Sequence, residues 1–163
     1  MVMAENMAPE AAPQADYLEM LQLVERLHRQ LLDVVKDELD REGLDDLNSV
    51  QALLLFNIGD QELTAGELRT RGHYLGSNVS YNLKKLVDAG YIRHERSAVD
   101  RRSVRVSLTE SGHAVREQLN VLFERQGSSL APVGGVEADQ LPAMNTNLAR
   151  IERFWADHIR FRM

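Results

Sequence analysis

Two adjacent arginines lie in a polar turn of this sequence, where they cannot form part of a packed core. Arg101 and Arg102 follow Asp100 in a polar turn. Short β-type runs at 91–95 and 103–108 lie on the two sides of the turn and predict a hairpin. Each guanidinium group can donate two parallel hydrogen bonds to the oxygens of one phosphate. A hairpin tip with two such groups suits a phosphate-lined groove.

An amphipathic helix is predicted directly before this hairpin, from about Ser77 to Ala89. Its apolar positions, among them Val79, Leu83 and Leu86, repeat at helical spacing and define an inward face. The polar positions that then face outward or lie at the edges are Ser77, Asn78, Ser80, Tyr81, Asn82, Lys84 and Lys85. A solvated face normally favours long charged residues, whereas Ser, Asn and Tyr have poorer helix propensity. The composition of this face therefore favours a role in binding.

The chemistry of this face suits DNA. Small hydroxyl groups let a helix approach the floor of the groove, Asn can bond adenine with both ends of its amide, and Tyr can reach phosphate or a thymine methyl group. Lys84 and Lys85 stand where contacts to the DNA backbone would be made. A base-reading helix followed by an arginine-tipped hairpin is the layout of a winged-helix DNA-binding domain.

Two charged residues of the hairpin are expected to act differently from its tip. Asp100 would repel phosphate, so its expected role is structural: it accepts hydrogen bonds from the turn or orients a neighbouring arginine. Arg105 lies in the return strand, where side chains alternate between the two faces. Val104, Val106 and Leu108 then occupy the other face. Arg105 therefore either contacts DNA or pairs with an acidic side chain.

The distribution of charge supports a nucleic-acid partner although the 163-residue chain has a net charge of −6. Residues 64–116 hold ten Lys or Arg and five acidic residues, so this segment is basic and the remainder is acidic. Charges act locally, because salt screens them over about 8 Å at physiological ionic strength. A chance cluster of solvated charges is the plainer interpretation, and the helix–hairpin context argues against it.

Several classes of protein are disfavoured by what the sequence lacks. It has no cysteine, which excludes disulfides, thiolate metal sites and cysteine-based redox sensing. Its five histidines have no i, i+4 pair, so no metal site is expected. No phosphate-binding glycine loop or Ser-His-Asp arrangement is found, and the protein is not expected to be an enzyme. Without an apolar run of membrane-spanning length or a signal peptide, a cytoplasmic protein with no membrane partner is expected.

Local signals in the sequence predict where several helices begin and end. Asn48 with Gln51 and Thr64 with Glu67 are capping pairs that predict two helix starts, the second opening a short helix to about Arg71. Gly43 predicts the end of the first helix.

Helical extensions are predicted on both sides of the basic segment. Residues 1–15 are expected to form a disordered tail, 16–45 a dimerisation helix, 46–112 the winged-helix DNA-binding lobe and 113–163 further dimerisation helices. The first helix has an apolar stripe broader than one packing contact requires. The last carries Phe154, Trp155 and Phe161. These helices hold more apolar surface than a lobe of about 80 residues can cover, which favours a second copy of the chain as partner.

Three blocks of sequence resemble the MarR family of winged-helix transcriptional regulators. They are Asp100-Arg101-Arg102-Ser103, Val106-Ser-Leu-Thr-Glu-Ser-Gly112 and Leu83-Lys-Lys-Leu-Val-Asp-Ala-Gly-Tyr-Ile92. The resemblance is strongest over residues 47–125, and the flanking helices match in length and position. Leu75-Gly-Ser-Asn-Val-Ser-Tyr-Asn82 departs from the commoner family pattern. With Ser49-Val-Gln-Ala-Leu-Leu-Leu-Phe-Asn-Ile58, it resembles the branch that regulates L,D-transpeptidase expression.

The resemblance implies a mainly α fold with a winged helix-turn-helix lobe, a short β-hairpin wing and N- and C-terminal dimerisation helices. It implies a homodimer bound to palindromic promoter DNA, with half-sites about one helical turn, 10–10.5 bp, apart. It also implies regulation by a small-molecule effector and no other cofactor, with His28 as the candidate effector contact. The branch resemblance implies control of cell-envelope or stress genes.

The alternative is a winged-helix module that binds a protein, with the basic wing serving an acidic partner. Salt dependence together with sequence selectivity separates the two functions, because DNA readout requires both.

Overall fold

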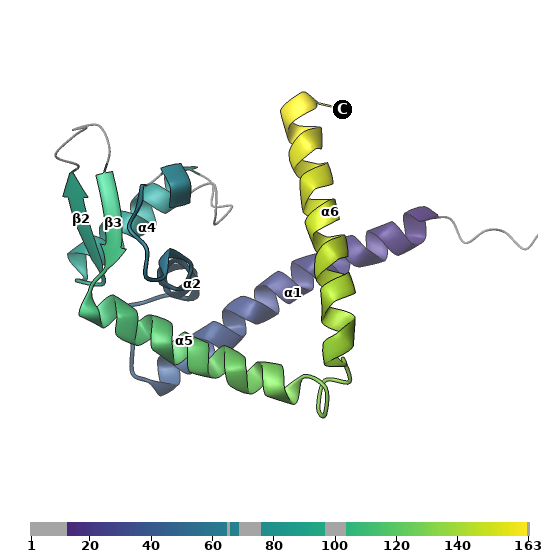
Figure 1. Ribbon diagram of the computed structural model, residues 1–163, viewed down its shortest axis with the longest axis horizontal. Coiled ribbons are helices and arrows are strands. Elements are labelled where there is room, and N and C mark those ends of the chain that lie inside the picture. Colours follow the sequence, from purple (N-terminus) through teal and green to yellow (C-terminus); the bar gives the residue numbers. More distant parts are fainter. Residues whose placement is uncertain (1–12, 65, 69–75, 97–103, 163) are drawn as a thin grey trace, which may run out of the picture. The chain divides into compact units, whose positions relative to one another are not determined.

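The computed structural model describes residues 13–64, 66–68, 76–96 and 104–162, which form two compact units on either side of the Leu119–Asn120 bond (Figure 1). The elements of the first unit are α1 (Pro13–Arg41), α2 (Ser49–Ile58), β1 (Leu63–Thr64), α4 (Gly76–Asp88), β2 (Ile92–Arg96), β3 (Val104–Leu108) and the start of α5 (Glu110–Ser129). The rest of α5, the 3-10 helix η1 (Ala138–Gln140) and α6 (Leu141–Phe161) form the second. The fold is mainly helical with one small sheet, which confirms the expected winged helix-turn-helix class.

The first helix begins earlier than the sequence indicated. Residues 13–15 were expected in a disordered tail, but α1 starts at Pro13 and this part of the expectation is wrong. Proline is well suited to the first position of a helix, because its fixed φ angle is helical and its missing N–H group would have no helical partner there. Residues 1–12 lie outside the described part of the chain. Gly43, at φ 69°, ends the helix as expected.

Two helix starts follow capping signals in the sequence. The side chain of Asn48 accepts a hydrogen bond of 2.8 Å from the backbone N–H of Gln51, and Gln51 Oε1 accepts one of 3.1 Å from the backbone N–H of Asn48. This reciprocal pair confirms the predicted start of α2. Thr64 and Glu67 form the same pair at 3.1 and 3.2 Å and open the helical turn at 66–68. The predicted continuation to Arg71 lies outside the described residues.

The wing is an antiparallel sheet in the order β1-β3-β2. Strand β3 is central, with Val106 opposite both Leu63 and His94. Val106 and Leu108 are buried and Val104 is half-buried, as the alternation of side chains predicts. The largest fully buried side chains of this unit come from α1, α2, the helical turn at 66–68, α4, α5 and the sheet: Val35, Leu54, Leu55, Ile58, Leu68, Val79, Leu86, Val106 and Leu119. This core fixes one face of α4.

Helix α5 leaves the wing through a tight contact. The hydroxyl group of Thr109 donates a hydrogen bond of 2.6 Å to the carbonyl oxygen of Gly90 and accepts one of 3.2 Å from the backbone N–H of Gly112. A Cβ atom at Gly112 would lie 2.2 Å from the carbonyl oxygen of Tyr91. The Thr-Glu-Ser-Gly segment therefore caps α5 and brings its first turn against the base of the wing.

The second unit presents apolar side chains to solvent. Those of α6 that are more than two-fifths exposed are Met144, Leu148, Phe154, Ile159 and Phe161. At the start of the helix, Gln140 Oε1 accepts a hydrogen bond of 2.9 Å from the backbone N–H of Glu137. None of the helices in the described part of the chain is both long and apolar enough to span a membrane.

Candidate nucleic-acid interface

Helix α4 has one buried and one exposed face. Val79, Leu83 and Leu86 are buried, while Tyr81 keeps 61% of its surface exposed. The other predicted contact residues on the exposed face are Asn78, Ser80, Lys84 and Lys85. The structure thus brings five of the seven predicted helix residues to one surface. Ser77 belongs to α4, but its side chain lies outside the described part of the structure.

Asn82 lies on the buried face of α4. It was expected to face outward or to lie at the edge of the exposed face, and that placement is wrong: its exposed fraction is 9%, and its Oδ1 accepts a hydrogen bond of 3.3 Å from Gln51 Nε2. The reason is helical spacing, because position 82 is three residues after Val79 and four before Leu86, both of which are buried. The sequence already shows this spacing, but the polar character of asparagine led to the prediction of an exposed position.

Two cationic side chains of α4 stand at its exposed face. The ammonium group of Lys85 lies 5.6 Å from the centre of the Tyr81 ring, one helical turn away. Such a contact favours an ordered position of both side chains, since the ring face attracts the cation. Lys84 is exposed beside it. The arrangement presents an aromatic ring and two positive charges from one helix.

The wing contributes further cations. Arg93 and Arg96 of β2 are exposed. Arg105 Nη1 lies 3.5 Å from Glu62 Oε2, with both side chains about half exposed, so the pairing with an acid that the sequence left open is present. An exposed pair of this kind contributes little stability and can be exchanged for another anion. Asp100, Arg101 and Arg102 lie outside the described residues, and their roles stay predictions.

A pocket lies between α4 and the wing. Its volume is about 330 Å³, and its lining is mainly apolar: Ser80, Leu83, Lys84, Val87, His94, Val104 and Val106. Ser80 and Lys84 therefore belong both to this pocket and to the exposed face of α4. His94 was not singled out in the sequence, because only the pairing of β2 with β3 brings it opposite Val106.

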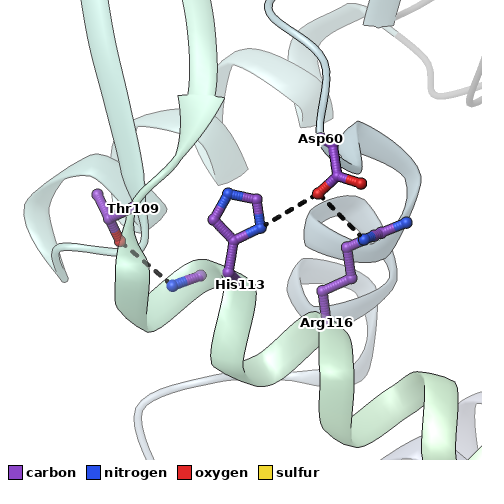
Figure 2. A network of polar contacts seen from close by, with 5 residues as sticks. Asp60, Thr109, His113 and Arg116 are labelled. Carbon is purple, nitrogen blue, oxygen red and sulfur yellow. Dashed lines mark hydrogen bonds and ion pairs between the residues drawn. The ribbon is translucent and has the colours of Figure 1, made fainter.

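A polar cluster fixes the turn after α2 against α5 (Figure 2). Asp60 Oδ1 lies 3.3 Å from Arg116 Nη1 and 3.6 Å from His113 Nδ1. Arg116 Nε is buried without a hydrogen-bond partner among the described groups. The cluster links elements of the winged-helix lobe. Within the described residues, no three His, Cys, Asp or Glu side chains gather as metal ligands would.

A helix with a buried and a polar exposed face, followed by a three-stranded wing with exposed arginines, defines a winged-helix protein. A family model described as MarR family matches residues 45–103. The exopolysaccharide II synthesis transcriptional activator ExpG of Rhizobium meliloti (strain 1021) is 35% identical over 145 residues, which are 89% of this chain and 74% of that protein. The chain belongs to the MarR family of winged-helix transcriptional regulators.

Solved structures agree on the fold. A MarR variant from E. coli complexed with operator DNA has a TM-score of 0.68 and 20% identity, covering 86% of this chain and 99% of that one. The S. aureus MepR–DNA complex has a TM-score of 0.68 and 21% identity, covering 81% and 95%. The narrower resemblance to regulators of L,D-transpeptidase expression stays a prediction.

Proposed function

We propose that the protein is a homodimeric regulator that binds palindromic promoter DNA with α4 in the major groove. The observation that carries this proposal is the exposed face of α4, where Tyr81, Lys84 and Lys85 stand on a helix whose opposite face is fixed in the core. Ser80 and Asn78 are placed to read base edges, while the lysines contact phosphates. Arg101 and Arg102, with Arg93 and Arg96, supply the flanking contacts of the wing.

The second copy of the chain covers the apolar surface of α1 and α6. Leu23, Leu27 and Leu31 follow one another at four-residue intervals on α1, and each keeps more than two-fifths of its surface exposed. Side chains at this spacing form one ridge along a helix. Solvent-exposed ridges of leucine are typical of interfaces, since soluble monomers rarely expose large apolar patches. Dimerisation would place the two lobes on successive turns of DNA.

The pocket between α4 and the wing offers a route to regulation by a small molecule. An occupant that contacts Ser80 and Lys84 would occupy side chains that DNA binding requires, so the ligand and DNA would exclude each other. His28 is exposed on α1, next to Leu27, and remains the candidate effector contact that the sequence suggested. The pocket does not depend on His28.

We infer the target genes and the direction of regulation from the relative that shares 35% identity. That protein is a transcriptional activator of exopolysaccharide II synthesis. We propose that this chain likewise activates genes for an extracellular polysaccharide, which is compatible with the cell-envelope role that the branch resemblance implies. Comparison of transcripts among the parent strain, a deletion strain and the complemented deletion strain tests the proposed target genes separately from DNA binding.

The binding proposal is tested by recovering genomic fragments that the purified protein retains and then titrating the best fragment by fluorescence anisotropy. A scrambled duplex runs beside it at two salt concentrations. The expected result is nanomolar affinity for the operator, about 10³-fold or more above the scrambled duplex. Equal, salt-erased binding to both duplexes contradicts sequence-specific regulation and favours an acidic protein as the partner of the wing.

A further inference from the structure

We propose that Gln51 and Asn82 are positioning residues for DNA recognition: Gln51 holds α4 at a fixed rotation against the N-terminus of α2. The inference rests on the proposed function, since it assigns how the base-reading face of α4 is oriented. Both side chains are buried, with exposed fractions of 7% and 9%. They lie 31 positions apart in the chain and join through the bond between Gln51 Nε2 and Asn82 Oδ1.

The direction of this bond is dictated by the backbone. The N–H group of Asn48 can only donate, and it donates to Gln51 Oε1 at 3.1 Å. The oxygen end of the Gln51 amide is therefore turned toward the start of α2, and the Nε2 end is left for Asn82. Because Nε2 can only donate, Asn82 must present its oxygen. One backbone group thus sets the orientation of two amides in series.

This geometry excludes Asn82 from reading adenine. Bidentate recognition needs the oxygen and the nitrogen of the same amide, together with free access to a base edge. The oxygen of Asn82 is engaged by Gln51, and the side chain is nine-tenths buried. Asn82 therefore acts through the position of α4 and not through contact with DNA.

A directional hydrogen bond can fix the rotation of α4 about its axis, whereas the apolar contacts of this helix cannot. The buried Val79, Leu83 and Leu86 hold the helix against the core, but apolar contact is non-directional and tolerates small rotations. A hydrogen bond weakens steeply when its angle departs from linearity. Tyr81 precedes Asn82 in the helix and points outward with 61% of its surface exposed. Rotation about the α4 axis would move Tyr81 across the groove.

The same end of α2 is also tied to α1. The hydroxyl group of Ser49 donates a hydrogen bond of 2.6 Å to the carbonyl oxygen of Leu32. Ser49 is adjacent to Asn48, whose N–H group orients Gln51. A polar path therefore runs from the backbone of α1 through the first turn of α2 to the recognition helix. Gln51 is the residue of α2 from which this path continues to Asn82 of α4.

The test is a double-mutant cycle with side chains of similar shape that make no hydrogen bonds. Gln51→Met and Asn82→Leu each leave a buried partner group without its bond, whereas the double variant removes both groups. We expect each single change to lower operator affinity about tenfold while binding to scrambled DNA changes less than about twofold. Because both single changes remove the same directional bond, the double variant is expected to lose about as much affinity as either single variant and not the product of the two losses.

The readout separates positioning from direct contact. If Asn82 touched a base, Gln51→Met would keep most of its operator affinity, and the preference at one operator position would relax in every variant without Asn82. That result overturns the inference. Additive losses, which would lower the affinity of the double variant about a hundredfold, also overturn it, because independent residues give additive effects.

Asn48→Ala is the matched control for stability. It weakens the cap of α2 but leaves the Gln51–Asn82 bond in place, so the unfolding temperature falls while the operator-to-scrambled ratio stays within about twofold. Circular dichroism confirms that all variants are folded before they are titrated. If the wild-type protein shows no preference for any DNA sequence, the proposed function fails and this inference falls with it. If the wild-type protein binds its operator specifically but the losses in the cycle are additive, the inference is contradicted and the proposed function stands.

Discussion

The hydroxyl group of Tyr91 donates a hydrogen bond of 2.8 Å to Asp46 Oδ1, which joins the base of the wing to the connection between α1 and α2. Tyr91 directly precedes β2 and is 7% exposed. Its backbone N–H donates to the carbonyl oxygen of Leu86 at 2.9 Å, and its carbonyl oxygen accepts from Thr109 at 3.1 Å. One residue therefore contacts the end of α4, the end of β3 and the α1–α2 connection. The orientation of the wing depends on this junction.

This junction predicts a pH dependence of stability. Burial, together with the hydrogen bond to Asp46 and the charge of that carboxylate, raises the pKa of Tyr91 from 10.0 to about 12. The folded protein thus holds the phenol proton more tightly than the unfolded chain does. The contribution to stability is complete below pH 10 and is lost as the pH rises through the folded-state value.

Tyr91→Phe measures this contribution. At neutral pH the variant is expected to unfold at lower denaturant concentration, with a loss of about 1–2 kcal/mol, because Asp46 loses its donor. The difference between variant and wild type should shrink as the pH rises above 10, where the phenol begins to ionise in the unfolded chain. Urea unfolding at several pH values gives the free energies. A difference that stays constant up to pH 11 contradicts the assignment.

Gly112 and Gly127 of α5 predict opposite effects of alanine. A Cβ atom at Gly112 would lie 2.2 Å from the carbonyl oxygen of Tyr91, so Gly112→Ala must displace α5 from the wing and is expected to cost about 1–3 kcal/mol. A Cβ atom at Gly127 meets nothing within 4 Å. Gly127→Ala is expected to stabilise the helix by up to about 1 kcal/mol. Thermal unfolding of both variants compares them, and equal effects would mean that the contact at Gly112 is absent.

The sequence predicted the framework well because its signals are local. The capping pairs at Asn48 and Thr64, the glycine after α1 and the alternation of Val104, Val106 and Leu108 each act within a few residues, and all are present. Long-range partners could not be predicted in this way. Local spacing from Val79 and Leu86 already places Asn82 on the buried face, but nothing near it in the sequence identifies its hydrogen-bond partner Gln51, which lies 31 positions away.

The hairpin shows the same limit. The alternation of β3 predicted that Arg105 points away from the buried face, yet its choice between DNA and an acid depended on Glu62, which lies 43 positions earlier. Residues 101 and 102 carry the strongest phosphate-binding chemistry in the sequence, but their placement lies outside the described part of the chain. The phosphate-binding chemistry of these two arginines could be predicted from the sequence, whereas their positions could not.

Lys85 is predicted to contact phosphate. Lys85→Ala should weaken binding to operator and scrambled DNA alike and should lower the salt slope of log affinity by about one contact. The matched control is Lys36→Ala, which removes the same charge from α1, where Lys36 pairs with Asp40 at 2.8 Å. The control should leave the slope unchanged. Anisotropy titrations over a salt series provide the slopes, and equal slopes for Lys85→Ala and wild type would remove Lys85 from the phosphate contacts.

The exposed leucine ridge of α1 is predicted to hold the dimer. Leu27 is 65% exposed in the single chain, and burial of a leucine side chain contributes about 1.5–3 kcal/mol. Leu27→Glu replaces that gain with the cost of burying a charge, and the partner copy contributes the same substitution again. We expect the variant to stay folded but to dissociate, and its operator affinity to fall because one lobe alone contacts one half-site.

The mass in solution decides this prediction. Light scattering after gel filtration should give twice 18.5 kDa for the wild-type protein and 18.5 kDa for Leu27→Glu. Gln22→Glu adds the same charge at an exposed polar position of α1 and serves as the control, which should remain dimeric. A Leu27→Glu protein that keeps the doubled mass would place the interface elsewhere. A monomeric wild-type protein would contradict the two-lobe arrangement, since a single lobe cannot span two half-sites of a palindrome.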